Sequence, residues 1–208
     1  MVHTIFFDLD NTLYSRDSGL WEAISERIDL YITEVLLINE NKVGEIRDYC
    51  RQNYHTSLQG LRSLYQINES EYLAFVHDID LSKTLTNDGR LTKMLASISQ
   101  RKIIFTNSDS HHANRVLNFF GIRSHFDIIV DLLSLNPYHK PDPEAFEKAL
   151  LLSGLHASKG CLFIDDMIEN VEQGQKMGFL SILVGESTNN FQNIPNIFML
   201  PEYLESLD

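Results

Sequence analysis

Short runs of apolar residues recur along the chain, and charged or turn-forming residues bound each run. The runs cover residues 5–7, 103–105, 128–130, 162–164 and 181–184. Continuous apolar runs of this length are typical of strands covered on both faces, as in parallel sheets. We therefore expect five such strands, and a sixth, short strand at residues 197–199 after a polar surface loop at residues 187–196.

Segments with helical spacing separate the predicted strands. One follows Asn107, one follows Asp142 and one follows Asp166, and a glycine closes each of them. Pro143 stands directly after Asp142, a position where proline favours the first turn of a helix. Alternation of strands and helices predicts an α/β fold with a doubly wound, mainly parallel, Rossmann-like sheet.

Residues 15–88 break this alternation. Apolar residues recur there at helical spacing, beginning with Leu20, Ile24 and Ile28, and no strand pattern interrupts them. We interpret this segment as an all-helical insertion that follows the first strand. The predicted domains are an α/β catalytic core of residues 1–14 and 89–208 and a helical cap of residues 15–88.

Composition narrows the class of protein. The chain has 208 residues, 43% of them hydrophobic, and a formal net charge of −12. Such a charge argues against binding a nucleic-acid polymer, which needs a cationic surface, although a local metal site still permits an anionic substrate. Cys50 and Cys161 both lie in apolar surroundings and are expected to be buried small hydrophobes. No basic leader pattern and no membrane-length apolar run is visible, so we expect a cytoplasmic protein without a membrane partner.

Residues whose side chains could bind a ligand or take part in catalysis follow several of the predicted strands or lie in the loops between them. Asp8 and Asp10 come directly after the first apolar run, and Asp165 and Asp166 come after another. In open α/β sheets, ligands bind beyond the carboxyl ends of the strands. Two further segments belong to this group, Thr106-Asn107-Ser108 and His139-Lys140-Pro141.

Each of these segments alone has a structural explanation, because Asp and Asn favour turns. Carboxylates, a hydroxyl and a lysine at the same edge of one sheet are harder to explain without a site. His111 and His112 adjoin the Thr106 loop, and we expect them to be solvated residues at a helix start.

The ordered set of DxDxT, a hydroxyl with Asn, Lys-Pro and Asp-Asp resembles the haloacid dehalogenase superfamily over nearly the whole chain. This resemblance implies that Asp8 is a nucleophile and that Asp10 is the general acid and base. It also implies that Thr106 and Lys140 bind the transferring phosphoryl group, with Asn107 beside it. The implied Mg²⁺ ligands are Asp8, Asp10 and Asp165, supported by Asp166 and Asn170.

Asp10 separates two activities within that superfamily. A dehalogenase needs no acid at this position, because a halide leaves without a proton. An alkoxide leaving group does need a proton, so Asp10 favours a phosphatase.

Several details resemble the pyrimidine 5′-nucleotidase branch, among them Asn11 in the first motif and the cap segment around Tyr54. The resemblance implies that Tyr54 and Gln59 contact substrate, although packing within the cap is an alternative for Tyr54. His55 departs from the branch, because a Gly is common there.

The expected activity is therefore Mg²⁺-dependent hydrolysis of a phosphate monoester, with a pyrimidine nucleoside 5′-monophosphate as the leading small-molecule partner. Sugar phosphates and other small phosphorylated metabolites are alternatives, as is a phosphomutase. A non-catalytic binding protein on the same fold is the alternative from a different class.

Overall fold

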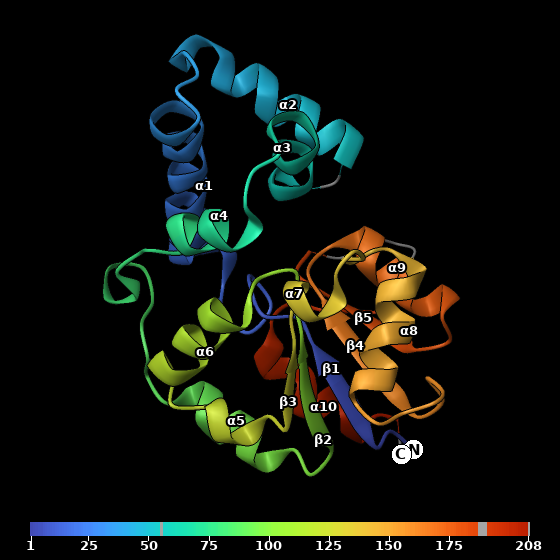
Figure 1. Cartoon of the computed structure of the whole chain (residues 1–208). Coiled ribbons are helices and arrows are strands. Elements are labelled where there is room, and N and C mark those ends of the chain that lie inside the picture. The colour runs from blue at the N-terminus through green and yellow to red at the C-terminus, as the bar shows by residue number, and fades with distance from the viewer. Residues whose placement is uncertain (55, 187–190, 208) are drawn as a thin grey trace. The chain divides into compact units, whose positions relative to one another are not determined.

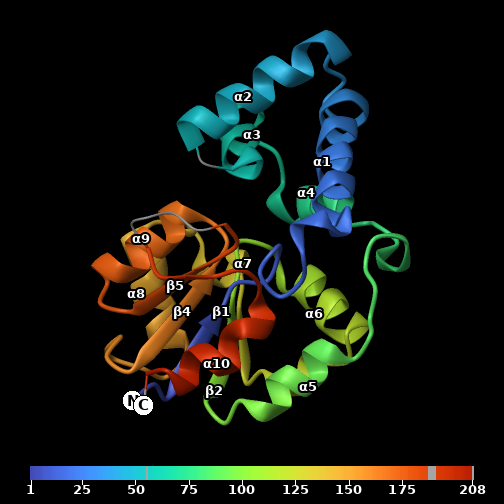
Figure 2. The ribbon, with the colours of Figure 1, turned by 180° about the vertical axis from the view of Figure 1, so that it is seen from behind.

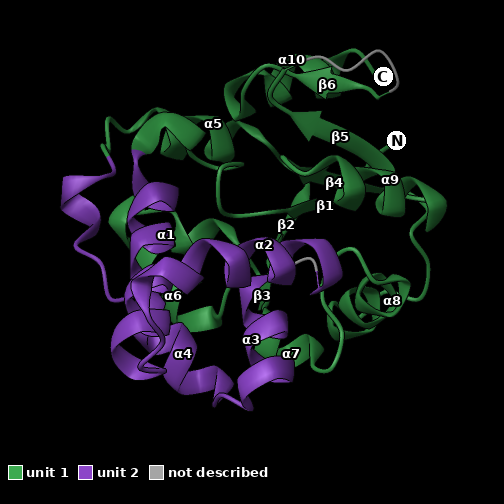
Figure 3. Cartoon of the chain, turned by 90° about the horizontal axis from the view of Figure 1, so that it is seen from above, with its two compact units in different colours: residues 1–18, 86–208 green, residues 19–85 purple. Residues whose placement is uncertain are grey.

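The chain folds into two compact units, residues Met1–Ser18 with Thr86–Asp208 and residues Gly19–Leu85 (Figure 3). The computed structural model describes residues 1–54, 56–186 and 191–207. His55, whose departure from the branch bears on the predicted substrate pocket, lies outside the described residues. The assignment of the second unit as a substrate cap stays a prediction.

Unit 1, the larger of the two, contains a six-stranded sheet with the order β3-β2-β1-β4-β5-β6. Every strand pair is parallel, which confirms the predicted α/β fold. Five strands coincide with the apolar runs, and their bounds are Thr4–Phe7 (β1), Arg101–Phe105 (β2), Ile128–Val130 (β3), Cys161–Asp165 (β4) and Leu180–Val184 (β5).

The sixth strand was predicted at the wrong residues. Residues 197–199 form a 3₁₀ turn, and β6 is the two-residue strand Asn193–Ile194 beside β5. The side chain of Asn196 accepts a hydrogen bond from the backbone of Phe198, which favours a turn over an extended strand. Pro201 then stands in the first turn of the following helix.

Helices cover both faces of the sheet. Phe146 of the α8 helix (Pro143–Leu152) packs with Phe6, Phe105 and Phe163 of three strands in the main apolar cluster. Figures 1 and 2 show α8 on one face and α10 on the other. The helices of this unit are Arg90–Ser97 (α5), Ser110–Phe119 (α6), Leu132–Leu135 (α7), Pro143–Leu152 (α8), Ile168–Lys176 (α9) and Leu200–Glu205 (α10).

The described residues of unit 2 form helices joined by short turns and contain no strand, as their apolar spacing predicted. Its α1 helix continues into a π-helical turn at Tyr31–Val35. The helices of this unit are Leu20–Leu30 (α1), Val43–Tyr54 (α2), Ser57–Tyr65 (α3) and Glu69–Val76 (α4).

One arginine and one glycine help to hold the helices of unit 2 together. Arg47 of α2 donates to the Ser25 hydroxyl and the Asp29 carboxylate of α1. Gly60 of α3 lies so close to Cys50 of α2 that an added Cβ would stand 2.3 Å from its sulfur. Glycine at position 60 therefore lets α2 and α3 approach each other.

Both cysteines are buried and free, as expected for small hydrophobes. None of the helices in the described part of the chain is long and apolar enough to cross a membrane. The expected cytoplasmic location stays a prediction.

Candidate active site

The central strands bring the predicted functional residues to one edge of the sheet. Phe7, the last residue of β1, is in register with Ile104 of β2 and Ile164 of β4. The backbone amide of Asp8 then donates to the carbonyl of Ile164 at 2.9 Å. Asp8, the loop after β2 and the end of β4 therefore meet beyond the carboxyl ends of neighbouring strands.

Lys140 joins two carboxylates at this edge. Its Nζ donates to Oδ1 of Asp8 and to Oδ2 of Asp165, each at 2.7 Å. All three side chains are buried. Burial alone would lower the pKa of Lys140, but the charges of Asp165 and Asp8 outweigh burial and raise it well above its ordinary value. Lys140 is therefore held as a buried cation.

Asn107 fixes the backbone of Lys140. The Asn107 side chain donates from Nδ2 to the Lys140 carbonyl and accepts at Oδ1 from the Lys140 amide, both at 2.9 Å. Substrate binding was predicted for Asn107, but its side-chain amide is engaged with Lys140. A substrate contact at this residue stays a prediction for its backbone amide, while the side chain positions Lys140.

Asp165 receives four hydrogen bonds. Oδ1 accepts from the Met167 amide at 2.8 Å and from Asn170 Nδ2 at 2.9 Å. Oδ2 accepts from Lys140 and, at 3.1 Å, from the same Asn170 nitrogen. A carboxylate has about four lone-pair positions, so these bonds engage the capacity of Asp165. Asn170 supports Asp165, which is the role predicted for it.

Three carboxylates form a candidate metal centre. Oxygens of Asp8, Asp165 and Asp166 lie within 4.8 Å of one another. Burial, with the charges of Asp165 and Asp166, raises the pKa of Asp8 despite the opposing charge of Lys140. Burial, followed by the charge of Asp165, raises the pKa of Asp166 to about 7. Hard oxygen donors that repel one another fit a divalent cation such as Mg²⁺.

This set differs from the predicted metal ligands in one member. Asp10 was predicted as a ligand and Asp166 as a supporting residue, whereas the group contains the Asp166 carboxylate and not that of Asp10. Three hydrogen-bond partners hold the Asp10 side chain, and its role as a metal ligand stays a prediction.

These partners surround both oxygens of Asp10. Its Oδ1 accepts from the Tyr14 hydroxyl at 2.6 Å and lies 2.9 Å from His112 Nε2. Its Oδ2 accepts from the Ser108 hydroxyl at 2.6 Å. Burial by itself would raise the pKa of Asp10. The charge and hydrogen bond of His112, with the bonds from Ser108 and Tyr14, outweigh burial and hold this pKa well below its ordinary value.

The structure corrects the interpretation of His112. Its side chain is 1% exposed and contacts Asp10, whereas we expected a solvated residue. The α6 helix places it there, because Asp109 is the N-cap and accepts a hydrogen bond from the His112 amide. His111 is exposed, as expected. Sequence spacing gave no signal that separates the two histidines.

Thr106 and two residues after Asp8 complete this edge. Thr106 is buried, and its hydroxyl oxygen accepts from the Ser108 amide at 3.0 Å, which leaves the hydroxyl proton free to donate. Thr12 Oγ1 and Asn11 Oδ1 are buried without a hydrogen-bond partner among the described residues. Asn11 has a φ of 61°, a left-handed conformation that asparagine tolerates, and it turns the chain between Asp10 and Thr12.

Tyr54 and Gln59 belong to unit 2, where each has a hydrogen-bond partner. The Tyr54 hydroxyl accepts from Ser63 at 3.0 Å, and its ring centroid is 6.2 Å from that of Tyr49. Gln59 lies in the first turn of α3, where its amide donates to the N-cap Thr56. Their predicted contact with substrate stays a prediction.

Comparison with known proteins identifies the family. The family model of haloacid dehalogenase-like hydrolases matches residues 2–178. Phosphate metabolism protein 8 of Saccharomyces cerevisiae is 30% identical over 187 residues, which cover 83% of this chain. The matched part is 58% of the yeast protein, so the chain spans little more than half the length of that relative.

Solved structures with low sequence identity share the fold. A HAD phosphatase from Thermococcus onnurineus is 16% identical, with a TM-score of 0.67 and 98% of each chain covered. The HAD-hydrolase YfnB from Bacillus subtilis, bound to magnesium, is 17% identical, with a TM-score of 0.66 and coverage of 98% of this chain and 99% of that one. The L-2-haloacid dehalogenase from Xanthobacter autotrophicus is 14% identical, with a TM-score of 0.65 over the whole of both chains. A phosphatase and a dehalogenase match equally well, so fold similarity alone does not distinguish the two reactions.

Proposed function

The chain belongs to the haloacid dehalogenase-like hydrolases, and on that premise we propose that it hydrolyses phosphate monoesters with Asp8 as the nucleophile. One observation carries the proposal: buried Lys140 bridges Asp8 and Asp165, beside a second carboxylate, Asp10, that is held by its own donors. A nucleophile, a buried cation and a separate acid–base group are the parts that this reaction requires.

In the first step, a carboxylate oxygen of Asp8 attacks phosphorus and the bond to the substrate alkoxide breaks. The negative charge of the bound phosphate opposes the low pKa of Asp10 and favours its protonation. Asp10 then gives its proton to the leaving oxygen, and an acyl phosphate forms on Asp8. In the second step, Asp10 takes a proton from water, the water oxygen bonds to phosphorus, and Asp8 and inorganic phosphate are released. Lys140 offsets negative charge at phosphorus throughout, and Thr106 offers a hydroxyl donor at the same edge.

Mg²⁺ is the proposed cofactor. Asp8 and Asp166 would hold it directly, because the oxygens of Asp165 already accept four hydrogen bonds. A bound divalent cation supplies charge neutralisation that lets an anionic nucleophile approach an anionic phosphate. Asp165 then contributes by holding Lys140 in place.

Asp10 supports a phosphatase over a dehalogenase. Three hydrogen-bond partners fix this carboxylate two residues after Asp8. Burying and positioning a charged group in this way costs free energy, which is expected where the group has a function. Departure of an alkoxide needs a proton, whereas departure of a halide does not. The yeast relative, named for phosphate metabolism, points in the same direction.

For the substrate, we propose a pyrimidine nucleoside 5′-monophosphate, with unit 2 as the cap that contacts the nucleoside. The support is the resemblance of the first motif and of the segment around Tyr54 and Gln59 to the nucleotidase branch. Core residues meet only the phosphoryl group, which all phosphate monoesters share, so discrimination requires contacts beyond the core.

A phosphate-release screen over nucleotides and sugar phosphates tests the activity and the substrate together. We expect Mg²⁺-dependent release, fastest with UMP or CMP. A preference for sugar phosphates would leave the phosphatase and reject the nucleotidase. Transfer of the phosphate to another hydroxyl would indicate a phosphomutase, and binding without turnover would indicate a non-catalytic protein.

Tyr54→Ala tests the role of the cap. We expect kcat/KM on UMP to fall by about tenfold, while kcat/KM on p-nitrophenyl phosphate changes little. The matched control is Tyr49→Ala, which removes the neighbouring ring of the same helix. Equal losses on both substrates would assign Tyr54 to packing within unit 2.

A further inference from the structure

The three partners of Asp10 come from separate parts of unit 1. Tyr14 follows β1, Ser108 lies in the loop after β2, and His112 lies in the first turn of α6. They converge on one carboxylate at distances of 2.6–2.9 Å. His112 and Tyr14 are buried. Convergence of buried polar groups on a single side chain defines its position more tightly than packing alone does.

The two carboxylate oxygens of Asp10 have different numbers of hydrogen-bond partners. Oδ1 has Tyr14 and His112 as partners, and these two engage both of its lone pairs. Oδ2 accepts from Ser108, which occupies one of its lone pairs. A proton that Asp10 exchanges with a substrate or a water is therefore placed on Oδ2.

The backbone that carries the His112 side chain is anchored at the start of α6. The Asp109 carboxylate caps the start of α6 and accepts from the His112 amide at 2.9 Å. Asp131 accepts from the Ser110 amide, also at 2.9 Å, and so ties the same turn to the residue after β3. The first turn of α6 is thus anchored at two amides, which fixes the backbone position from which the His112 side chain extends.

We propose that His112 is a positioning residue which, with Tyr14 and Ser108, holds the Asp10 carboxylate so that Oδ2 carries the proton exchanged with the leaving group and with water. This inference rests on the proposed function, because it assigns the support of its acid–base group. In the first step, the proton moves from Asp10 Oδ2 to the leaving oxygen as the bond between that oxygen and phosphorus breaks and the Asp8–phosphorus bond forms. In the second, a water proton returns to Oδ2 as the water oxygen bonds to phosphorus and the Asp8–phosphorus bond breaks.

His112→Leu removes the imidazole nitrogen and keeps an apolar side chain in the buried position. We expect kcat on an alkyl phosphate to fall by about 10- to 100-fold with little change in KM, which is part of the usual contribution of acid–base catalysis. Release of p-nitrophenol in the first turnover should fall far less, because that leaving group departs without a proton. His112→Gln retains an N–H donor at the end of its side chain and should recover much of the lost kcat.

His111→Leu is the matched control, since His111 is the exposed neighbour in the same turn. We expect it to leave both substrates unaffected. Melting temperatures of all variants separate misfolding from mispositioning. Equal losses on the alkyl and p-nitrophenyl substrates would overturn the proposal. So would a folded His112→Gln variant that is no better than His112→Leu.

A measurement without turnover distinguishes failure of this inference from failure of the proposed function. In the wild-type protein, ¹⁵N spectra of the imidazoles should show a hydrogen-bonded Nε2 for His112. The loss of this signal in His112→Leu identifies it, because Nε2 of His3 also lies 3.1 Å from a carbonyl. Asp10→Ala should change the His112 signal. A signal unaffected by Asp10→Ala would reject the role of His112, whatever the activity. Wild-type protein without phosphatase activity would instead reject the proposed function, while the spectra still report the contact.

Discussion

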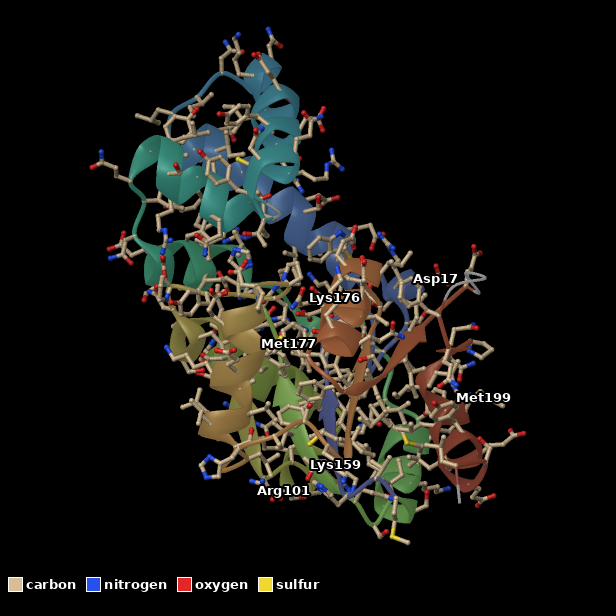
Figure 4. All side chains as sticks on the ribbon, turned by 90° about the vertical axis from the view of Figure 1, so that its right-hand side faces the viewer. Asp17, Arg101, Lys159, Lys176, Met177 and Met199 are labelled. Carbon is tan, nitrogen blue, oxygen red and sulfur yellow. The ribbon has the colours of Figure 1, made fainter. Side chains whose placement is uncertain are left out.

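Two buried lysines at opposite ends of the same sheet have opposite surroundings. Lys140 lies beyond the carboxyl ends of the strands, where two carboxylates accept from its Nζ. Lys102 lies in β2 near the amino ends, where its Nζ donates to the carbonyls of Ile98 and Gln100. Figure 4 shows that end of the unit, marked by Arg101 and Lys159.

The two pKa shifts differ accordingly. Burial lowers the pKa of Lys102, and the charge of Asp127 opposes burial only in part. The carboxylates of Asp165 and Asp8 instead outweigh burial at Lys140 and raise its pKa. Lys102 bonds the carbonyl of Ile98, the C-cap of α5, and that of Gln100 in the loop before β2. Lys140 is instead a cation kept beside a nucleophile. Burial of a charge therefore does not indicate function; the partners of the charge do.

Asp8→Asn removes the nucleophile at the Lys140 end and should have the largest effect. An amide is a poor nucleophile and a weak metal ligand, so we expect kcat to fall by more than about 10³-fold. Trapping with beryllium fluoride should place an adduct on Asp8 in the wild-type protein and none in the variant. Near-normal turnover of Asp8→Asn would reject the phospho-aspartate mechanism.

Lys140→Met and Lys102→Met form a matched pair that tests the comparison directly. Loss of Lys140 leaves Asp8 and Asp165 buried without their cation, so we expect lost turnover and about 3 kcal/mol of lost stability. The equivalent change at Lys102 should leave turnover unchanged. Urea unfolding and phosphate release measure the two quantities. Comparable loss of turnover in both variants would contradict the division between the two ends.

Asp166→Asn and Asp165→Asn separate the metal ligand from the lysine anchor. We expect Asp166→Asn to raise the Mg²⁺ concentration for half-maximal activity sharply and to weaken the increase in melting temperature that Mg²⁺ causes. For the wild-type protein that increase should correspond to about 2.7 kcal/mol at a hundredfold excess over Kd. Asp165→Asn should instead lower stability in the absence of Mg²⁺. The opposite pattern would restore Asp165 as the direct ligand.

The sequence predicted what depends on local pattern. Five strands were found because each is a continuous apolar run, and the acids at their ends were found because they follow those runs directly. The two-residue strand β6 is too short to produce a pattern, and Ile197 is an apolar residue in a turn. A run of three apolar residues therefore does not distinguish a short strand from a 3₁₀ turn.

The support of the site depends on the tertiary fold and was not predictable in the same way. His111 and His112 look alike in sequence, and only the direction of the α6 turn makes one exposed and the other a partner of Asp10. Asp165 and Asp166 are likewise adjacent and identical. Their roles separate because Asn170, Met167 and Lys140 donate hydrogen bonds to Asp165.

The smallest expected effect is the pH dependence at Lys102. Its folded-state pKa lies below the ordinary value of 10.5, so between these two values the unfolded chain binds more protons than the folded chain. Stability that depends on this group therefore rises as the pH increases through that window. Wild-type protein should gain stability relative to Lys102→Met between pH 8 and about pH 10.5. Urea unfolding of both proteins at the two pH values measures the difference in stability. At each pH, the turnover of Lys102→Met should equal that of the wild-type protein. A gain for Lys102→Met instead would mean that the two carbonyls favour the charged amine more than burial disfavours it, and Lys102 would then resemble Lys140 after all.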